Sequence, residues 1–231
     1  STDKADGGHS SNGSGTDNAN GTGGVGGTDG ADGDNQDTVT DNPLKIVESG
    51  WSADQQGYVH YAFALRNTSK TQQVQYPQIT ITGRAKDGSI VFSQTQALNM
   101  AFPNQTVYDA GQAGEGTAPE TVDFTVLNPD TYNVAKAQGT AAFPISGISK
   151  IDNRDGGTTF NGEVRAVADG FKPSDGQQIK ISLVLRNAQN AIIYGDIAFV
   201  DWPGNGRSTP FSITVYDLPK YVSYDLYAQI W

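Results

Sequence analysis

The sequence predicts an all-β chain in which two tandem β-sandwich domains follow a long N-terminal segment of low complexity. Short runs of alternating apolar and polar residues recur along the chain, and turn-forming residues separate them at intervals of about 8–12 residues. A late segment of the sequence also has a shorter counterpart near the middle. Helical periodicity is not evident. Short strands with frequent turns favour sandwiches over other β architectures.

The N-terminal segment, residues 1–42, is dominated by Gly, Asp, Asn, Ser and Thr, and its few apolar residues cannot form a core. Ordering such a backbone costs about 1–2 kcal/mol per residue, which this composition does not offset. We therefore expect a disordered, acidic, Gly-rich tether at 1–42. The remaining chain divides into a first domain at 43–137, a linker at 138–144 and a second domain at 145–231.

A strand, proline, strand pattern occurs twice and is the basis for predicting two similar domains. The two copies span residues 122–137 and 210–231. Aligning them places Val126 on Val215, and upstream of the copies Phe102-Pro103 aligns with Trp202-Pro203. Internal repeats of this kind indicate repeated structural units. We expect the two domains to superpose with these residues matched.

In the first domain, the clearest strand is predicted at 58–65, where Val59, Tyr61, Phe63 and Leu65 alternate with smaller or polar residues. This period of two is typical of a sheet with one buried face. Asp87-Gly88 predicts a hairpin between strands at 78–84 and 89–95. A polar loop is expected at 111–119, before a strand at 122–126.

The second domain shows the same kinds of signal. Strands are predicted at 160–167, 178–186, 191–200, 211–216 and 222–230, with Gln189-Asn190 in the hairpin position of Asp87-Gly88. Large aromatic residues usually fill the space between the sheets of a small sandwich. We assign five aromatics to the two cores: Tyr61, Phe63, Phe124, Phe211 and Tyr224.

Composition excludes several kinds of chemistry. The chain has no cysteine, so it has neither a thiol nucleophile nor a disulfide framework. The net charge of -10 argues against nucleic acid and against anionic membrane surfaces, which attract basic proteins. No apolar run approaches the ~18–20 residues that span a bilayer. We predict no cofactor and no metal site.

Catalytic residues are scarce, and we predict that the protein is not an enzyme. Only His9 and His60 are present, and a Ser-His-Asp triad would have to use His60, whose strand position suits a solvent-side or partly buried polar residue. The carboxylate pairs Asp152 with Asp155 and Asp196 with Asp201 could serve a hydrolase, but turn and edge positions explain them more simply.

Ligand binding by exposed aromatic residues is the alternative that we keep. Trp202 precedes the loop sequence Pro203-Gly204-Asn205-Gly206, where an exposed ring could stack on a carbohydrate or contact a peptide. Trp202 and Asn205 are therefore the candidate ligand-binding residues. Anchoring of the loop by a packed Trp202 is the competing explanation.

The duplicated strands resemble the FxLYD family of bacterial extracellular domains. The likeness rests on residues 211–217, on Tyr224-Asp225-Leu226-Tyr227 and on residues 57–67, GYVHYAFALRN. The LYD of the family pattern appears here as Val215-Tyr216-Asp217, and in the first copy as Val126-Leu127-Asn128. The resemblance implies immunoglobulin-like sandwiches on an exported protein, often a lipoprotein, of mostly Gram-positive bacteria.

The expected function is therefore non-enzymatic binding or display at the cell envelope. Its partner would be a protein or a glycan, and contact with the membrane would occur only through an N-terminal lipid anchor. A sequence that starts at Ser1 without methionine fits a mature product, or an artificially shortened chain, whose targeting segment has been removed. The alternative is a carbohydrate-binding or enzyme accessory module that uses aromatics near Trp202.

Overall fold

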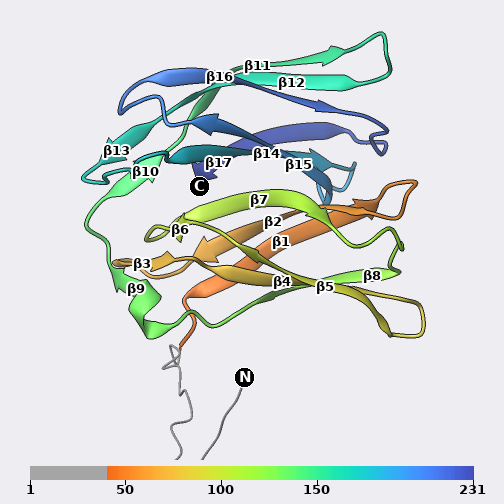
Figure 1. Ribbon diagram of the computed structural model, residues 1–231, viewed down its shortest axis with the longest axis horizontal. Helices are drawn as coiled ribbons and strands as arrows, with labels where there is room; N and C mark the ends of the chain where they lie inside the picture. The colour runs from red at the N-terminus through yellow and green to blue at the C-terminus, as the bar shows by residue number, and fades with distance from the viewer. Residues whose placement is uncertain (1–40) are drawn as a thin grey trace, which may run out of the picture. The chain divides into compact units, whose positions relative to one another are not determined.

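A computed structural model describes residues 41–231, which form two β-sandwiches stacked on one another (Figure 1). The described residues contain seventeen strands and one 3-10 turn, Thr131–Asn133, with no α-helix. The predicted all-β sandwich class is thus confirmed. Of the expected tether at 1–42, only Asp41 and Asn42 are described, and residues 1–40 lie outside the described part.

The first sandwich has two antiparallel three-stranded sheets. One has the order β1-β2-β7 and the other β5-β4-β8. A third small sheet, β6-β3-β9, closes one end (Figure 1). The strands are β1 (Leu44–Ala53), β2 (Val59–Asn67), β3 (Gln72–Gln75), β4 (Gln78–Arg84), β5 (Ile90–Ala97), β6 (Met100–Ala101), β7 (Thr106–Ala113), β8 (Thr121–Val126) and β9 (Val134–Lys136).

The second sandwich repeats this plan with the sheets β11-β12-β16 and β15-β14-β17, also antiparallel. Its strands are β10 (Thr140–Ala142), β11 (Ile145–Asp152), β12 (Thr158–Arg165), β13 (Val167–Asp169), β14 (Gln178–Arg186), β15 (Ile192–Asp201), β16 (Ser208–Val215) and β17 (Ser223–Ile230). The segment 138–144, expected as a linker, contains β10, which pairs with β13. Its Ala141 and Phe143 are buried in the core of the second sandwich.

The strand orders of the two sandwiches correspond one to one. Strands β1, β2 and β7 match β11, β12 and β16, while β5, β4 and β8 match β15, β14 and β17. In both copies the chain crosses from one sheet to the other between the second and third of these matched strands, from β2 to β4 and from β12 to β14, as in immunoglobulin-like sandwiches. The turns agree as well: Gly88 and Asn190 occupy the same hairpin position, and both have positive φ, 85° and 63°.

The duplicated sequence pattern nevertheless matched two strands that are not equivalent. Val126 ends β8, which pairs with β4, whereas Val215 ends β16, which pairs with β12. Placing Val126 on Val215 is therefore wrong, because any two half-buried strands share the same alternation while their pairing partners differ. The upstream match holds: Phe102 and Trp202 both precede the matched strands β7 and β16.

Two further expectations fail for identifiable reasons. Residues 111–113, expected in a loop, belong to β7, where Gly111 leaves room for the ring of Tyr61. Strand β2 was expected to bury one face, yet Ala62 and Ala64 on its other face are 0% exposed. The second sandwich covers that face.

The aromatic core agrees with the sequence prediction. Tyr61, Phe63 and Phe211 are buried, while Phe124 and Tyr224 are partly buried against the same two cores. The rings contact one another: Tyr61 and Phe63 both pack against Phe124, at 5.9 and 6.0 Å between centroids. In the second core Tyr224 meets Phe160 edge-on at 4.8 Å.

Replacing Phe211 by alanine should lower the free energy of unfolding by about 3–5 kcal/mol, because truncating a buried Phe leaves a cavity. The matched control is Thr214→Ser on the exposed face of the same strand, which keeps the hydroxyl that bonds to Thr159. Urea denaturation of the whole protein checks this. Equal losses for the two variants would contradict the assigned faces of β16.

Candidate functional site

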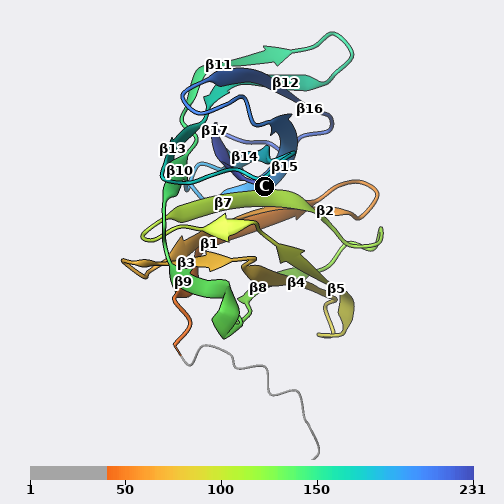
Figure 2. The same cartoon turned by 60° about the vertical axis from the view of Figure 1, so that its left-hand side comes forward.

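The most extensive polar arrangement in the described residues lies where the two sandwiches meet. Sheet β1-β2-β7 of the first packs against sheet β15-β14-β17 of the second (Figure 2). Four small or branched residues form the apolar centre of this interface: Ala62, Ala110, Val184 and Ile192. Tyr108 and Tyr227 extend the centre, with their rings stacked at 3.7 Å. The two joined sheets are not equivalent, because β1-β2-β7 corresponds to β11-β12-β16 of the second sandwich and not to β15-β14-β17.

Two glycines set how closely these sheets approach. A Cβ on Gly50 of β1 would overlap the carbonyl oxygen of Ile192, and a Cβ on Gly195 of β15 would overlap the carbonyl oxygen of Tyr61. In both places the backbones themselves are in contact, so no side chain fits between them. The two sandwiches are held at a separation that only glycine allows.

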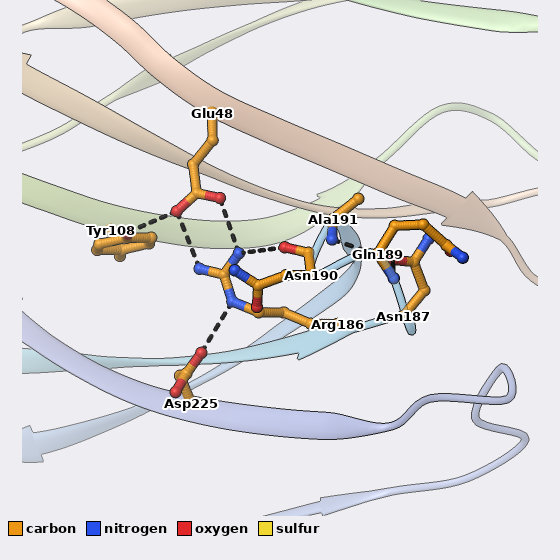
Figure 3. A network of polar contacts seen from close by, with 8 residues as sticks. All are labelled: Glu48, Tyr108, Arg186, Asn187, Gln189, Asn190, Ala191 and Asp225. Carbon is orange, nitrogen blue, oxygen red and sulfur yellow. Dashed lines mark hydrogen bonds and ion pairs between the residues drawn. The ribbon is translucent and has the colours of Figure 1, made fainter.

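Arg186 of β14 is the centre of a charged network at this interface (Figure 3). Its two terminal nitrogens donate to the two carboxylate oxygens of Glu48 in the first sandwich, at 2.7 and 2.9 Å. Its Nε donates to Asp225 of β17 at 2.9 Å. Tyr108 also donates to Glu48. This bidentate geometry is the strong form of an arginine–carboxylate contact and fixes the relative orientation of both groups.

The hairpin after β14 completes the network. Arg186 donates to the carbonyl of Asn190 at 3.0 Å. The Asn187 side chain shapes this turn by accepting the N–H groups of Gln189 and Ala191, both at 3.0 Å (Figure 3). The left-handed backbone at Asn190 suits an asparagine, which tolerates positive φ better than most residues.

A second network is fully buried. Lys180 of β14 and Asp109 of β7 are joined at 2.7 Å, with 2% and 0% of their side chains exposed. Gln229 of β17 donates to the same carboxylate oxygen at 2.7 Å. The ammonium of Lys180 also lies 4.3 Å from the ring centre of Trp231, within cation–π range.

The two networks differ in their electrostatics. Hydrogen bonds from Arg186 lower the pKa of Glu48, although its burial acts in the opposite direction. For Asp109, burial raises the pKa, and the Lys180 ammonium opposes that rise. Asp109 Oδ2, Ser182 Oγ and Gln229 Oε1 are buried without a hydrogen-bond partner among the described residues. The inner pair thus pays a large desolvation cost, which its short contact and the hydrogen bond from Gln229 offset only in part.

His60 is part of the same interface. Its Nε2 lies 3.2 Å from Asp54, and its ring stacks on Tyr194 of the second sandwich at 4.8 Å between centroids. Ser52 lies opposite His60 in the β1–β2 register, and no hydrogen bond joins the two side chains in the described structure. The histidine is partly buried and contributes to docking.

The structure gives the carboxylates of the considered pairs separate partners. Asp152 pairs with Lys150 at 3.1 Å, and Asp155 accepts the Tyr216 hydroxyl at 3.1 Å. Asp196 accepts from Tyr194 and from its neighbour Ile197, while Asp201 accepts from Gln178. These contacts hold turns and strand edges.

The predicted ligand residues near Trp202 have structural contacts. The Trp202 ring is partly buried and meets Phe143 edge-on at 5.7 Å and Phe171 at 6.2 Å. Asn205 accepts the N–H of Ala168 at 2.8 Å and donates to its carbonyl at 3.2 Å. The first residue packs the loop onto the second core, and the second extends the hydrogen bonding of β13.

Sequence reasoning did not single out the residues of the interface networks. A signal was present, since residues 178–186 have Lys180, Ser182 and Arg186 on one face together with Val184. The 58–65 strand likewise has Ala62 and Ala64 on its presumed solvent face. Small apolar residues on the second face of a strand, beside an isolated charge, indicate a covered face.

No protein-family model matches the chain, and no curated protein matches it. Among solved structures, the crystal structure of Amycolatopsis orientalis exo-chitosanase CsxA aligns with 76% of this chain at 11% identity and a TM-score of 0.21. The alignment covers 24% of the chitosanase chain, so this chain spans about a quarter of that protein's length. A TM-score this low supports no inference about fold or function. Within residues 41–231 no helix is long and apolar enough to cross a membrane.

Replacing Lys180 by methionine should lower the free energy of unfolding by about 3–5 kcal/mol, because it leaves the Asp109 carboxylate buried without its partner charge. Replacing both residues, as Lys180→Met with Asp109→Leu, should restore most of that loss. Denaturant melts of the two variants check the prediction. A double variant as unstable as the single one would show that the charges themselves stabilise the interface.

The pH dependence of stability should reveal Glu48. A carboxylate whose pKa is lowered on folding contributes stability above its ordinary pKa of about 4.3, and this contribution is lost as the pH falls through the lowered value. As the pH falls from about 4.3 through the lowered pKa of Glu48, the wild-type protein should therefore lose more free energy of unfolding than the Glu48→Gln variant does. Parallel stability curves for the two proteins would contradict this role of Glu48.

Proposed function

We propose that the protein is a non-enzymatic binding and display module of the bacterial cell envelope, exported and held there by an N-terminal lipid anchor. The resemblance of residues 211–217 and 224–227 to FxLYD domains supports the location. The observation that carries the proposal is the interface between the sandwiches, which joins them into one block.

A display module has to present its surfaces in a fixed orientation. Domains joined in one chain move relative to one another unless their interface is large and apolar. Here the contact of backbones at Gly50 and Gly195 and the bidentate pair of Arg186 with Glu48 oppose such motion. The block thus acts as a rigid spacer, and its exposed surfaces are available to a partner.

Labelling of intact cells tests the location. Antibodies raised against residues 41–231 should stain unbroken cells of the source bacterium, and external protease should remove that staining. Staining that requires permeabilised cells would overturn the proposal. An antibody against a cytoplasmic protein of the same cells is the control for intactness.

Distances between spin labels test the rigid block. The sequence contains no cysteine, so introduced cysteines are the only labelling sites. Labels at the exposed Thr95→Cys and Glu163→Cys, one on each sandwich, should give a single distance distribution. Its width should equal that of the control pair Thr95→Cys and Thr121→Cys within the first sandwich. A markedly broader distribution for the first pair would show that the domains move independently.

A further inference from the structure

Tyr76, between β3 and β4, has an unusual backbone for its residue type. Its φ is +50°, in the left-handed region that favours glycine and asparagine, and proline follows it at position 77. A left-handed conformation is disfavoured for an ordinary residue because its Cβ comes too close to the following carbonyl oxygen, and a bulky side chain there is a true outlier. Strain of this kind is retained where the side chain has a use.

The Tyr76 side chain has no visible structural use. It is 57% exposed. Within residues 41–231 its ring takes part in no aromatic pair and its hydroxyl in no hydrogen bond, in contrast to the exposed tyrosines Tyr132 and Tyr216, which donate to Asp130 and Asp155. The strained backbone therefore presents an aromatic ring to solvent.

Two hollows meet at this ring. One, of about 310 Å³, is lined by Tyr76, by the apolar residues Leu127 and Pro129, and by four polar residues, Gln78, Asn128, Asp130 and Asn133. The other, of about 220 Å³, lies between Tyr76, Leu98, Asn99 and Trp231. Volumes of this order suit small ligands or single units of a longer one.

Trp231 comes from the second sandwich, so the apolar hollow exists only because the sandwiches are docked. Tyr76, Leu98 and Asn99, which line the hollow together with Trp231, belong to the first sandwich. The Trp231 backbone is bonded to Gln178 in both directions, at 2.9 and 3.2 Å, and its ring faces Lys180 at 4.3 Å. The interface networks thus hold one wall of the hollow in place.

From this arrangement we propose that the surface around Tyr76 binds a neutral saccharide. Aromatic rings offer flat apolar faces on which the C–H face of a sugar ring can stack. The amides of Gln78 and Asn133 each supply both donors and an acceptor, which matches hydroxyl groups that donate and accept. Asn128, whose Oδ1 already accepts from Asn42 at 3.0 Å, adds the two donors of its amide nitrogen. A saccharide chain lying across Tyr76 would reach the amide-lined hollow on one side and Trp231 on the other.

The lining argues for this ligand over others. It contains one carboxylate, Asp130, and no Lys or Arg, so acidic saccharides and phosphate groups find no countercharge. A proline-rich peptide also uses aromatic grooves, but the row of amide side chains in the larger hollow suits many hydroxyls better than a chain of prolines. The inference deepens the binding function proposed above and rests on it by naming the class of ligand.

Titration with three hexasaccharides tests the site: β-1,4-linked N-acetylglucosamine, β-1,4-linked glucose and α-1,4-linked glucose. At least one should bind to the full chain in calorimetry and change its tryptophan fluorescence. Tyr76→Gly should weaken that binding about tenfold or more by removing the stacking ring. Tyr76→Phe, which keeps the ring, should bind within about twofold of wild type.

Controls separate binding from folding. Tyr216→Ala removes a tyrosine of similar exposure, 54%, from the second sandwich and should leave saccharide binding unchanged. Tyr76→Gly should melt at or above the wild-type temperature because glycine relieves the left-handed strain. Absence of binding by all three hexasaccharides, or equal binding by Tyr76→Gly, would overturn the inference.

A decaproline peptide tests whether the hollow binds a proline-rich peptide instead of a saccharide. If it binds with the same dependence on Tyr76 and the hexasaccharides do not bind, the hollow is a peptide groove and the saccharide assignment is wrong. The labelling of intact cells and the spin-label distances are independent of these titrations. Failure of the saccharide site therefore leaves the display function standing, and failure of the display function is recognised separately.

Discussion

Sheet β1-β2-β7 approaches sheet β15-β14-β17 so closely that backbone touches backbone at Gly50 and Gly195. Strands β2 and β14 consequently have no solvent face, and each is the central strand of a sheet buried on both sides. The second face of a sheet buried in this way needs small or apolar residues, or charges that are paired. Ala62, Ala64 and Val184 provide the first kind, and Lys180 and Arg186, both in ion pairs, provide the second. The folded part is therefore four sheets deep, and the inner two depend on each other for their burial (Figure 1).

The charged residues at this interface have a different role from that of the apolar contacts. Burial of apolar surface is indifferent to direction, so sheets joined by it alone can slide or rotate. The forked contact between Arg186 and Glu48 admits few orientations, and the inner pair of Lys180 and Asp109 admits fewer because unpaired buried charges are costly. The stacking of Tyr108 on Tyr227 adds a third fixed point. These contacts together fix the orientation of the two sandwiches relative to each other. They therefore also fix the position of Trp231 relative to the first sandwich.

Much of the fold could be predicted from local sequence patterns, whereas the interface could not. Strands β4 and β14 end where the alternation of residues 78–84 and 178–186 ends. An alternating pattern, however, does not show which strand pairs with which. The pattern therefore led to the wrong match of β8 with β16 and to the prediction that the second face of β2 is exposed to solvent. The end of β7 was missed because Gly111, which lies against the Tyr61 ring, and its small neighbours do not produce an alternating apolar pattern. Tyr76 gave no sequence signal either, because the sign of its φ is a property of the folded backbone. Trp202 attracted interest as a loop tryptophan, but a large aromatic before Pro-Gly can equally cover a core.

The way the two sandwiches stack also determines where the stack ends. A contact between unlike faces of equivalent units is heterologous and has no internal reason to stop, so a third unit could in principle add to either end. The outer sheets differ from the joined ones in the side chains at matching positions. Thr82 stands on β4 where Val184 stands on β14, and Asn161 and Glu163 stand on β12 where Ala62 and Ala64 stand on β2. In the terms used for repeat arrays, each sandwich is at once a repeat and a cap, because it buries one sheet against its neighbour and has polar residues at the matching positions of its outer sheet.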